Sequence, residues 1–557
     1  MSLSYRDSGV IRANKKQSPQ DPMESVGQWM EDNKSVASLR SMMEDPTLVF
    51  ALEGGQPIGG WKKYEVSQYT LRVDEHDHDK AKEVHLFSVD RPHMRAFHCS
   101  WFALFCAFLI WFSISPLLSQ IRDDLDISNE DIWTSSLASL QGALFMRFLL
   151  GPLCHKFGPR VLFSIVLCLA SIITACTGLI ENGEHLIILR LGIGMAGSCV
   201  VMTHYWSNSM FTRDVIGTVN GLCTGWGNMG GGITQLLVGS LLYPTFRTYV
   251  FDGDTEMAWR TVCLIPAATA FVTAIIIFYI SDDCPLGNYR ELKKHKSMPE
   301  VSATEKLWAG AKNFNAWLLF IQYACSFGVE LTMNNAASLY FRDEFGLSVE
   351  AAAAIASVCG SLNLFARGLG GFISDMSMKS FGMRGRLWVH TVFLLAEGAL
   401  VLVFSKVETM TSSIIIMIAF SFFVQAAEGS TFGIVPYVDP ANTGSITGIV
   451  GAGGSTGAIG FGMAFRQLGY GDAFFIMGCA IMGTSLLSVI ISIKKHSAMF
   501  WGKEEKSSHT KKGKRKLKSG RPKKHSNNYN IHAVARNAGS VRSEHSADPT
   551  TMTIQTW

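Results

Sequence analysis

The chain has 557 residues, of which 48% are hydrophobic and only 17% are charged, and its mean hydropathy is +0.20. This composition is too apolar for a soluble protein of that length. The charged residues gather in the first 95 residues, in a central stretch from Asp282 to about Lys312, and beyond Lys494, and the apolar runs between them have membrane-spanning length. Twelve cysteines are scattered through the sequence without paired spacing, which argues against a disulfide framework or a zinc site.

Residues 1–96 are polar, mixed in charge and without periodicity, so we predict a largely disordered arm. The first 45 residues contain no apolar core of a secretory signal. An acidic run from Asp74 to Asp79 includes His76 and His78, but no further ligands follow at regular spacing. The run therefore favours a flexible acidic linker over a metal site, and we predict no bound metal.

Twelve membrane-spanning helices are predicted, and their hydropathy places them at residues 97–121, 132–153, 161–180, 186–206, 216–243, 261–280, 316–341, 349–372, 387–404, 412–437, 445–465 and 473–493. The even number puts both termini on one side of the membrane. Basic loops at 155–160, 290–296 and 384–386 fall on that side, as do thirteen Lys and Arg residues between 494 and 524. The positive-inside rule makes this side cytosolic.

The sequence repeats itself once. Arg147 in the second span and Arg367 in the eighth are 220 residues apart, and Asn228 in the fifth and Ser455 in the eleventh are 227 apart. We therefore predict an all-α membrane protein with two pseudo-symmetric six-helix halves. Residues 97–281 form the first half and 316–493 the second, with a cytosolic central loop at 282–315 and a basic, largely disordered cytosolic tail at 494–557. Two such halves rocking about a midplane site is a general plan of secondary transporters.

Two glycine-rich stretches occupy equivalent places in the halves. The first, 221–232, lies in an apolar run without charged residues, and the second covers 448–457. Glycines one helical turn apart let a neighbouring helix approach closely. The glycines and the serine that mark these helices are Gly225, Gly227, Gly230, Gly231, Gly232, Gly451, Gly453, Gly454, Ser455 and Gly457.

Charged residues inside the spans are costly unless they find a partner or a watery cavity. Arg147 lies about 21 Å from the start of its span at Trp133, at about 1.5 Å per residue. Two equivalent guanidiniums without an evident partner carboxylate suit a planar oxyanion, which their forked donors match. Arg190 is near the predicted start of its span, which favours a structural or gating role over ligand binding.

Glu330 and Glu428 are the mid-span carboxylates that the sequence singles out. They either hold helices together through a salt bridge or hydrogen bond, or they carry protons, because burial favours the protonated form. Tyr323 and Phe327 are one turn apart, a spacing that fits a cavity wall and ordinary helix packing equally well. No nucleotide loop, metal-binding helix or nucleophile motif occurs, so we predict no enzyme activity and no cofactor.

A set of motifs resembles the nitrate/nitrite porter family of the major facilitator superfamily, particularly its eukaryotic high-affinity nitrate transporters. The resemblance runs from about His93 to Ile493. Its motifs are Pro116-Leu, Ile121-Arg-Asp-Asp-Leu125, Gly151-Pro-Leu-Cys-His-Lys-Phe-Gly-Pro-Arg160, Gly225-Trp-Gly-Asn-Met-Gly-Gly-Gly232, Phe327-Gly-Val-Glu-Leu, Gly371-Phe-Ile-Ser-Asp375, Gly382-Met-Arg-Gly-Arg386, Ala426-Ala-Glu-Gly429 and Gly451-Ala-Gly-Gly-Ser-Thr-Gly457.

The resemblance implies that Arg147 and Arg367 grip nitrate from two sides. It further implies that Asn228 donates to the anion and that Tyr323 and Phe327 line the pocket. The glycine-rich helices are expected to pack against the arginine-bearing helices and to slide as the halves rock.

Two positions depart from the family pattern. His155 stands where the family usually carries an aspartate that helps to latch the closed state, which leaves Asp375 as the aspartate of the gating set. Ser455 stands where the second motif often carries asparagine, so only one amide is available at the site.

The predicted function is secondary active import of nitrate, and of nitrite, by cation-coupled symport with alternating access. The proton is the expected coupling ion and sodium the alternative. An electroneutral nitrate/nitrite exchanger is a second hypothesis, and a nitrate sensor that signals through its long termini is a third. The plasma membrane is the expected location. The basic tail is either solvated or in contact with anionic lipid. No nucleic-acid partner is expected, and an accessory membrane protein is left open.

Overall fold

The computed structural model describes residues 62–297 and 302–503. These described residues belong to one compact unit. Most of the predicted arm and tail, residues 1–61 and 504–557, lies outside the described residues.

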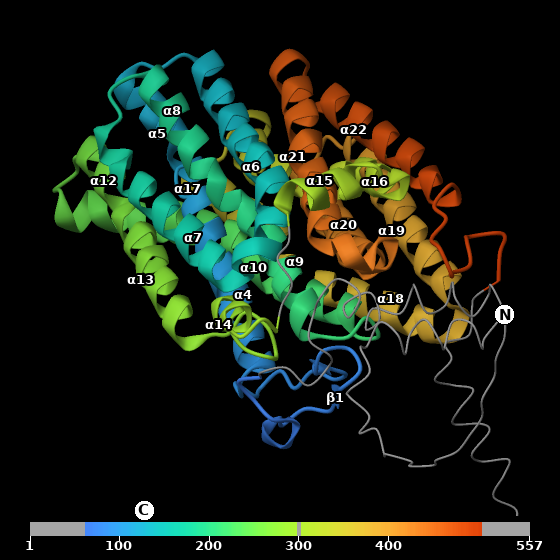
Figure 1. Ribbon diagram of the computed structural model, residues 1–557. Coiled ribbons are helices and arrows are strands. Elements are labelled where there is room, and N and C mark those ends of the chain that lie inside the picture. The colour runs from blue at the N-terminus through green and yellow to red at the C-terminus, as the bar shows by residue number, and fades with distance from the viewer. Residues whose placement is uncertain (1–61, 298–301, 504–557) are drawn as a thin grey trace, which may run out of the picture. The chain divides into compact units, whose positions relative to one another are not determined.

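Eleven helices among the described residues are long and apolar enough to cross a membrane (Figure 1). They are His93–Leu125, Asn129–Phe157, Pro159–Leu179, Gly183–Met210, Thr255–Ile280, Phe314–Phe345, Glu350–Phe381, Met383–Phe404, Met410–Val438, Pro440–Gln467 and Tyr470–Val489. The fifth predicted span is represented by α10 (Ile216–Thr234), which continues into a π-helical segment, Gln235–Leu242. Glycines lower the hydropathy of α10, but it runs beside the other helices, which is consistent with twelve spans.

The N-terminal half contains α4 to α13. Their bounds are α4 (His93–Trp111), α5 (Leu118–Leu125), α6 (Asn129–Phe157), α7 (Pro159–Ala175), α8 (Gly183–Ile193), α9 (Cys199–Met210), α10, α11 (Tyr243–Thr245), α12 (Thr255–Val262) and α13 (Leu264–Ile280). The C-terminal half contains α16 (Phe314–Phe345), α17 (Val349–Ser361), α18 (Ala366–Phe381), α19 (Met383–Phe404), α20 (Met410–Val438), α21 (Thr443–Gln467) and α22 (Tyr470–Ser485).

The internal repeat is visible in the turns that follow the two arginine-bearing helices. Gly158 ends α6 with φ +86°, and Gly382 ends α18 with φ +66°. A side chain is strained at such positive φ values, so glycine suits both corners. Pro159 follows as the first residue of α7, where its missing N–H costs no hydrogen bond. The same local chemistry thus turns the chain at equivalent points of the two halves.

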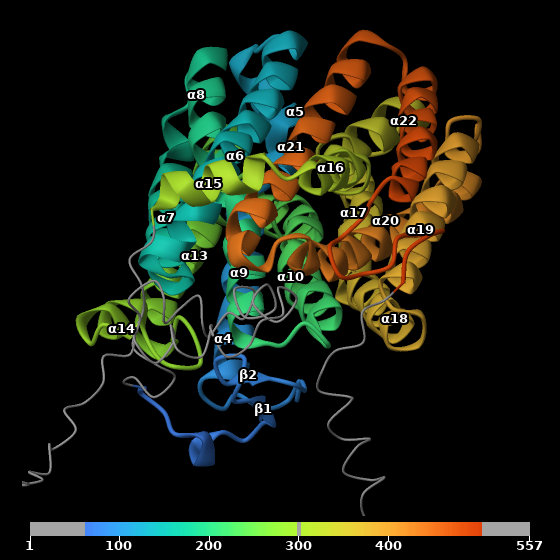
Figure 2. The same cartoon turned by 45° about the vertical axis from the view of Figure 1, so that its right-hand side comes forward.

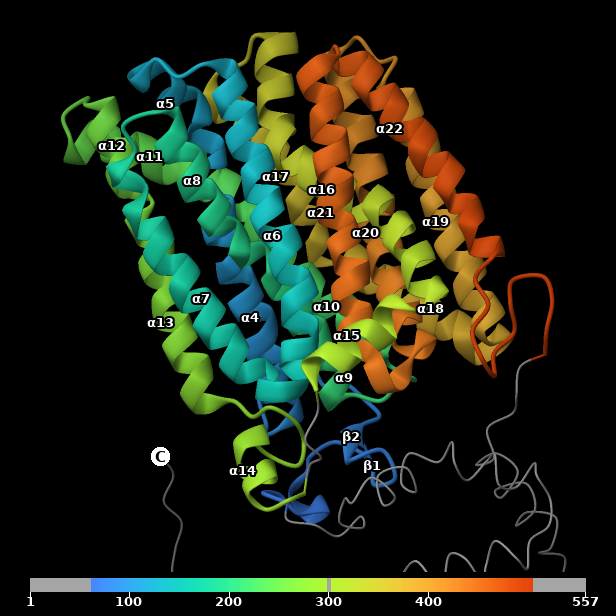
Figure 3. The same cartoon turned by 45° about the horizontal axis from the view of Figure 1, so that its top comes forward.

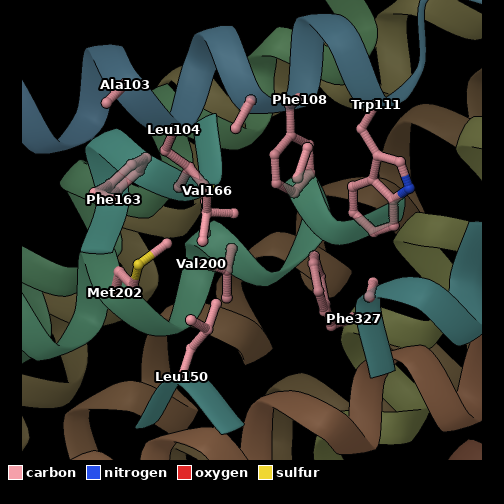
Figure 4. Packing of buried hydrophobic residues seen from close by; sticks show 14 of the residues in the cluster. Ala103, Leu104, Phe108, Trp111, Leu150, Phe163, Val166, Val200, Met202 and Phe327 are labelled. Atoms are coloured by element: carbon pink, nitrogen blue, oxygen red, sulfur yellow. The ribbon is translucent and has the colours of Figure 1, made fainter. Parts of the chain in front are cut away.

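Each glycine-rich helix packs against the opposite half. The N-terminal α10 contacts α18 as well as α4, and the C-terminal α21 contacts α6 as well as α16 (Figures 1 and 3). The larger apolar core joins the halves, because Phe327 of α16 belongs to the same cluster as Trp111 of α4, Leu150 of α6 and Val200 of α9 (Figure 4). The interface between the halves therefore contains both arginine-bearing helices.

One end of the bundle carries a short antiparallel pair, β1 (Val73–Asp74) with β2 (Lys80–Ala81), beside α14 (Tyr289–Lys294) (Figure 2). We call it the hairpin end, and the opposite end the far end. Disorder was predicted for residues 1–96, and this is wrong for residues 62–96. Asp79 is buried and binds Lys62 at 2.7 Å, and the Thr212 amide donates to the Ala81 carbonyl at 2.9 Å. The acidic run is a packed turn here, not a flexible linker.

Two buried aspartates at the start of the central loop explain this order. Asp282 accepts from Lys63 at 2.7 Å and from Tyr64 at 2.9 Å. Asp283 accepts from the backbone amides of Arg160 and Tyr289, both at 3.1 Å. Single-sequence reasoning missed the contacts of Asp282 with Lys63 and Tyr64, and of Asp283 with Arg160, because these partners are more than a hundred residues away.

The short helix α15 (Ala303–Ala311) follows in the central loop and packs on α21 and α6. At the other terminus, residues 494–503 are also ordered, contrary to the prediction for the tail. Arg384 donates to the Ala498 carbonyl at 3.3 Å, and Met499 is buried.

Candidate functional site

Arg147 sits on α6 in the middle of the bundle and is fully buried. Its guanidinium donates to the Gly197 carbonyl at 3.2 and 2.8 Å and to the Gly451 carbonyl at 2.6 Å. Gly451 belongs to α21, so this arginine bridges the two halves. It makes no ion pair with a carboxylate in the described part of the chain, and its charge is met only by carbonyl dipoles and by nearby aromatic faces.

Arg367 sits on α18 at the equivalent position and is equally buried. Its guanidinium pairs with Glu330 at 2.6 Å and with Glu428, and it donates to the Gln425 side chain at 3.2 Å. The Asn228 amide, with its oxygen turned to this arginine, accepts two further hydrogen bonds at 2.6 and 3.0 Å. The expectation that neither arginine has a partner carboxylate is therefore wrong for Arg367.

Phe327 of α16 lies next to both cations. The guanidinium carbon of Arg147 lies 5.0 Å from the centre of the Phe327 ring, and the guanidinium carbon of Arg367 lies 5.7 Å from it. Tyr323 stacks on Phe327 at 5.1 Å, and its buried hydroxyl makes no well-formed hydrogen bond in the described structure. Phe327 thus presents its ring to both arginines, and Tyr323 reaches them only through its stacking on Phe327.

The local charges balance only when the two arginines are taken together. Two carboxyl groups lie beside the Arg367 guanidinium, whereas Arg147 has only carbonyl oxygens as acceptors among the described residues. The salt-bridge interpretation of Glu330 and Glu428 is what the structure contains. The sites of the two halves have the same framework but opposite local charge.

The two carboxylates are not held equally. Glu330 also accepts a hydrogen bond from Asn363 at 2.7 Å. Glu428 makes only the ion pair with Arg367 in the described residues. Protonation therefore costs fewer contacts at Glu428 than at Glu330.

The glycine-rich helices approach the arginine-bearing helices at backbone contact. A Cβ added to Gly448 of α21 would lie 2.7 Å from the Arg147 carbonyl, and one added to Gly221 of α10 would lie 2.6 Å from the Arg367 carbonyl. The expected packing of the glycine-rich helices on the arginine helices is therefore present in both halves. The predicted marker glycines Gly225, Gly227, Gly230, Gly231 and Gly232 lie in α10, and Gly451, Gly453, Gly454 and Gly457 in α21.

Asn228 and Ser455 differ in their contacts, although they occupy equivalent places. Asn228 binds Arg367, while the Ser455 hydroxyl is buried without a hydrogen-bond partner in the described chain. The substitution of serine in the second motif thus leaves Arg147 without the side-chain amide that Arg367 has.

The residues that were predicted to gate the hairpin end, Asp375 and His155, also differ in their contacts. Asp375 of α18 accepts from the backbone amides of Gly217 at 3.1 Å and Thr218 at 2.6 Å, and it pairs with Arg386 at 2.6 Å. It thereby caps the start of α10 and ties the halves together. On the other half, His155 reaches the start of α21, where an added Cβ on Gly444 would lie 2.7 Å from its Nε2, but it offers no charge. One half carries an ionic latch and the other does not.

Arg190 lies on α8 towards the far end and does not contact Arg147 or Arg367 through any described bond. It donates to Ser136 at 2.7 Å, to Ser135 at 3.2 Å and to Asn335 of α16 at 3.3 Å. It therefore crosslinks the halves, as a gating residue would.

Two buried titratable side chains inside the spans were missed by the sequence analysis. Glu397 of α19 is fully buried, and neither carboxyl oxygen has a hydrogen-bond partner in the described structure. His204 of α9 stacks on Phe432, which in turn packs edge-on against Tyr323. Both lie in predicted spans, so a complete search for ionisable residues inside the membrane would have found them.

The comparisons with known proteins agree with this geometry. The sequence model of the Major Facilitator Superfamily matches residues 100–463. "High affinity nitrate transporter 2.5" of Arabidopsis thaliana is 37% identical over 388 residues, covering 70% of this chain and 76% of that protein. "High-affinity nitrate transporter 2.3" of Oryza sativa subsp. japonica is 36% identical over 414 residues, covering 74% and 78%.

This chain belongs to the nitrate/nitrite porter family of the major facilitator superfamily. A more distant relative in the family is "Nitrate/nitrite transporter NrtP" of Nostoc punctiforme, 26% identical over 432 residues, covering 65% of this chain and 84% of that protein. Members of this family are transporters, so the protein is a multi-pass integral membrane transporter and not an enzyme.

The fold agrees with solved structures of the superfamily. The inward-facing, unoccupied crystal structure of a bacterial homologue of the human lysosomal transporter Spinster superposes with a TM-score of 0.50 at 17% identity. The match covers 72% of this chain and 96% of that one. The likeness supports the major facilitator fold with two six-helix halves.

Proposed function

We propose that this protein imports nitrate, and also nitrite, by proton-coupled symport with alternating access. The observation that carries the proposal is the pair of buried arginines on equivalent helices of the two halves, both beside the Phe327 ring. The relatives named for nitrate transport support the substrate. A planar monoanion fits forked donors approaching from two sides.

Uphill import of nitrate without exchange for another anion requires coupling to a cation. A monoanion that enters a cell with a negative interior works against about 2.3 kcal/mol per 100 mV. One cation cancels the charge, so uphill import driven by the voltage needs at least two cations for each nitrate. An electroneutral exchanger would need none, and a nitrate-evoked inward current separates the two mechanisms.

The coupled proton binds to one of the two carboxylates beside Arg367, Glu330 or Glu428. With Glu330 and Glu428 both ionised, Arg367 is paired with two carboxylates and an approaching anion meets net negative charge. A proton on one carboxylate breaks one ion pair and leaves the guanidinium with a free donor. Glu428 is the better candidate, because Glu330 keeps the hydrogen bond from Asn363.

The hairpin end is the cytosolic end in this proposal. Lys156, Arg160, Lys293 and Arg384 lie in or beside its loops, and the positive-inside rule places such loops in the cytosol. Both termini then face the cytosol. The plasma membrane is the proposed location, where import from outside the cell would take place.

The test is uptake of labelled nitrate by a transport-deficient cell that expresses the wild type, Arg147→Lys or Arg367→Lys. Lysine keeps the charge but loses the planar fork. We expect both variants to reach the membrane and to lose at least about tenfold in uptake, which corresponds to about 1.4 kcal/mol. Wild-type levels of uptake in both variants would contradict the proposal.

A further inference from the structure

A second buried arginine environment lies between the halves, towards the far end. We call it the Arg190 cluster: Arg190 of α8, Ser135 and Ser136 of α6, and Asn335 of α16. Only 2% of the Arg190 surface is exposed, and in the described part of the chain it makes no ion pair. A buried charge met only by neutral oxygens is costly, so an uncompensated guanidinium points to a function.

A small pocket adjoins this cluster. Arg190 itself does not line it, but Ser136 of α6 and Asn335 of α16, both of which bind Arg190, do. The other lining residues are Trp133, Leu137, Leu140, Thr332, Ala336, Ala458 and Gly462. The lining comes from both halves, so its size depends on their relative position. In this structure, the Ser135 and Ser136 hydroxyls also donate to the Ile132 carbonyl, and the Asn335 amide donates to the Leu331 carbonyl.

An ion pair joins the two halves at the far end, on two of the helices that line the pocket. Glu130 in the first turn of α6 pairs with Arg466 in the last turn of α21, and both side chains are partly exposed to the outside of the bundle. When the halves part at this end, the Glu130–Arg466 pair breaks and Asn335 moves away from Arg190. The guanidinium and the two serine hydroxyls would then face an open vestibule.

The cluster is in line with Arg147. Ser136, Leu140, Ala143 and Arg147 follow one another on one face of α6, at spacings of four, three and four residues. Ser136 and Arg147 are thus separated by about 17 Å along the helix. Leu140 and Ala143 between them are apolar and buried, so nothing charged on this face interrupts the path.

We propose that the Arg190 cluster is a second anion site, which takes a small monovalent oxyanion at the far end and passes it to Arg147. This rests on the proposed function, and its ligand is the transported anion itself. A single uncompensated guanidinium with two hydroxyls and one amide favours a monoanion over a polyvalent one. The site raises the local anion concentration on the entrance path, so it acts on the apparent affinity and not on the translocation step.

The test is the concentration dependence of labelled nitrate uptake by full-length variants, with uptake expressed per molecule at the cell surface. Arg190→Gln removes the cation, and Asn335→Asp pairs it with a near-isosteric carboxylate. Both are expected to raise KM about tenfold at unchanged maximal rate, and Arg190→Lys to restore most of the affinity. Arg260→Gln is the matched control: this far-end arginine already pairs with Glu256, outside the interface, and its removal leaves KM unchanged.

Unchanged KM in Asn335→Asp at normal surface level overturns the proposal, as does a fall in maximal rate at unchanged KM, which a structural crosslink would give. If Arg190→Gln fails to reach the surface, Asn335→Asp decides. If the wild type takes up nitrate and the Arg190 and Asn335 variants have an unchanged KM, the proposal of a second anion site fails while the proposed function stands. Absence of nitrate uptake by the wild type refutes the proposed function and this site together.

Discussion

The two halves of this transporter share a framework but differ in charge. Each half presents one arginine from an equivalent helix, and each arginine backbone is pressed against a glycine of the opposite half, Gly448 or Gly221. Arg147 is met only by carbonyls, whereas Arg367 is met by two carboxylates and two side-chain amides. In the proposed function, the N-terminal half attracts the anion and the C-terminal half controls the proton.

The largest effect is expected where the shared framework is broken. Gly448→Leu and Gly221→Leu place a side chain where the added Cβ alone would lie within 2.7 Å of a backbone carbonyl. Helix backbones cannot yield as side chains do, so nitrate uptake should fall to background in both variants. Gly460→Leu is the control, because no atom lies within 4 Å of its added Cβ.

Retained uptake in either glycine variant, at normal surface level, would show that the close approach is not needed for transport. A loss in only one half would mean that the two glycine-rich helices do not play equivalent parts.

The next largest effect concerns coupling. Glu428→Gln removes one negative charge beside Arg367 permanently, so nitrate binding no longer waits for a proton. We expect downhill uptake to continue while the accumulation ratio of nitrate falls at least about tenfold, a loss of about 1.4 kcal/mol of coupling. Glu397→Gln, which neutralises a carboxyl without an ion-pair partner, should leave the ratio closer to the wild type. An unchanged ratio in Glu428→Gln would remove Glu428 from coupling.

A smaller effect is expected at the latch. Asp375→Asn loses the ionic pair with Arg386 and weakens the cap on α10, at a cost of about 1 kcal/mol. The hairpin end should then open more often, and alkylation of the buried Cys154 near that end, followed by mass spectrometry, should quicken about fivefold. Asp472→Asn at the start of α22 is the control. Equal alkylation rates of Cys154 in the wild type, Asp375→Asn and Asp472→Asn would argue against a latch at Asp375.

The smallest effect on transport is expected from Asp283 at the hairpin end, where pH acts on the stability of the fold. Burial raises the pKa of Asp283 to about 6, against the opposing influence of Arg160. Below the unfolded value near 4 this aspartate is protonated in both states, so the penalty of burying its charge appears as pH rises through about 4 to 6. Stability should therefore fall over that range, by up to about 3 kcal/mol, and stay level above it.

Thermal inactivation of the purified protein between pH 4 and 7.5 measures this loss of stability. Asp283→Asn should lack it, and Asp472→Asn should retain it. An identical pH profile for Asp283→Asn and the wild type would assign the effect to other groups.

Much of this architecture follows from the sequence because it is written in local patterns. Apolar runs predict the spans, and spacing predicts the repeat that relates Arg147 to Arg367. The resemblance supplied the packing of the glycine-rich helices, which the structure contains. The pairing of Arg367 with Glu330 and Glu428 was not predictable from spacing, because three different helices supply the partners. The ordered segment around Asp79 was missed because Asp282, which binds Lys63 and Tyr64, is more than 200 residues away in the sequence.

The most direct test of the account is nitrate binding to the purified protein between pH 5.5 and 8. Wild-type affinity should rise as pH falls, because a proton on the Glu330–Glu428 pair frees Arg367. Arg147→Lys should weaken binding at every pH and keep that slope, while Arg367→Lys should abolish the slope. A wild-type affinity independent of pH, or a slope lost only in Arg147→Lys, would contradict the division of roles between the two halves.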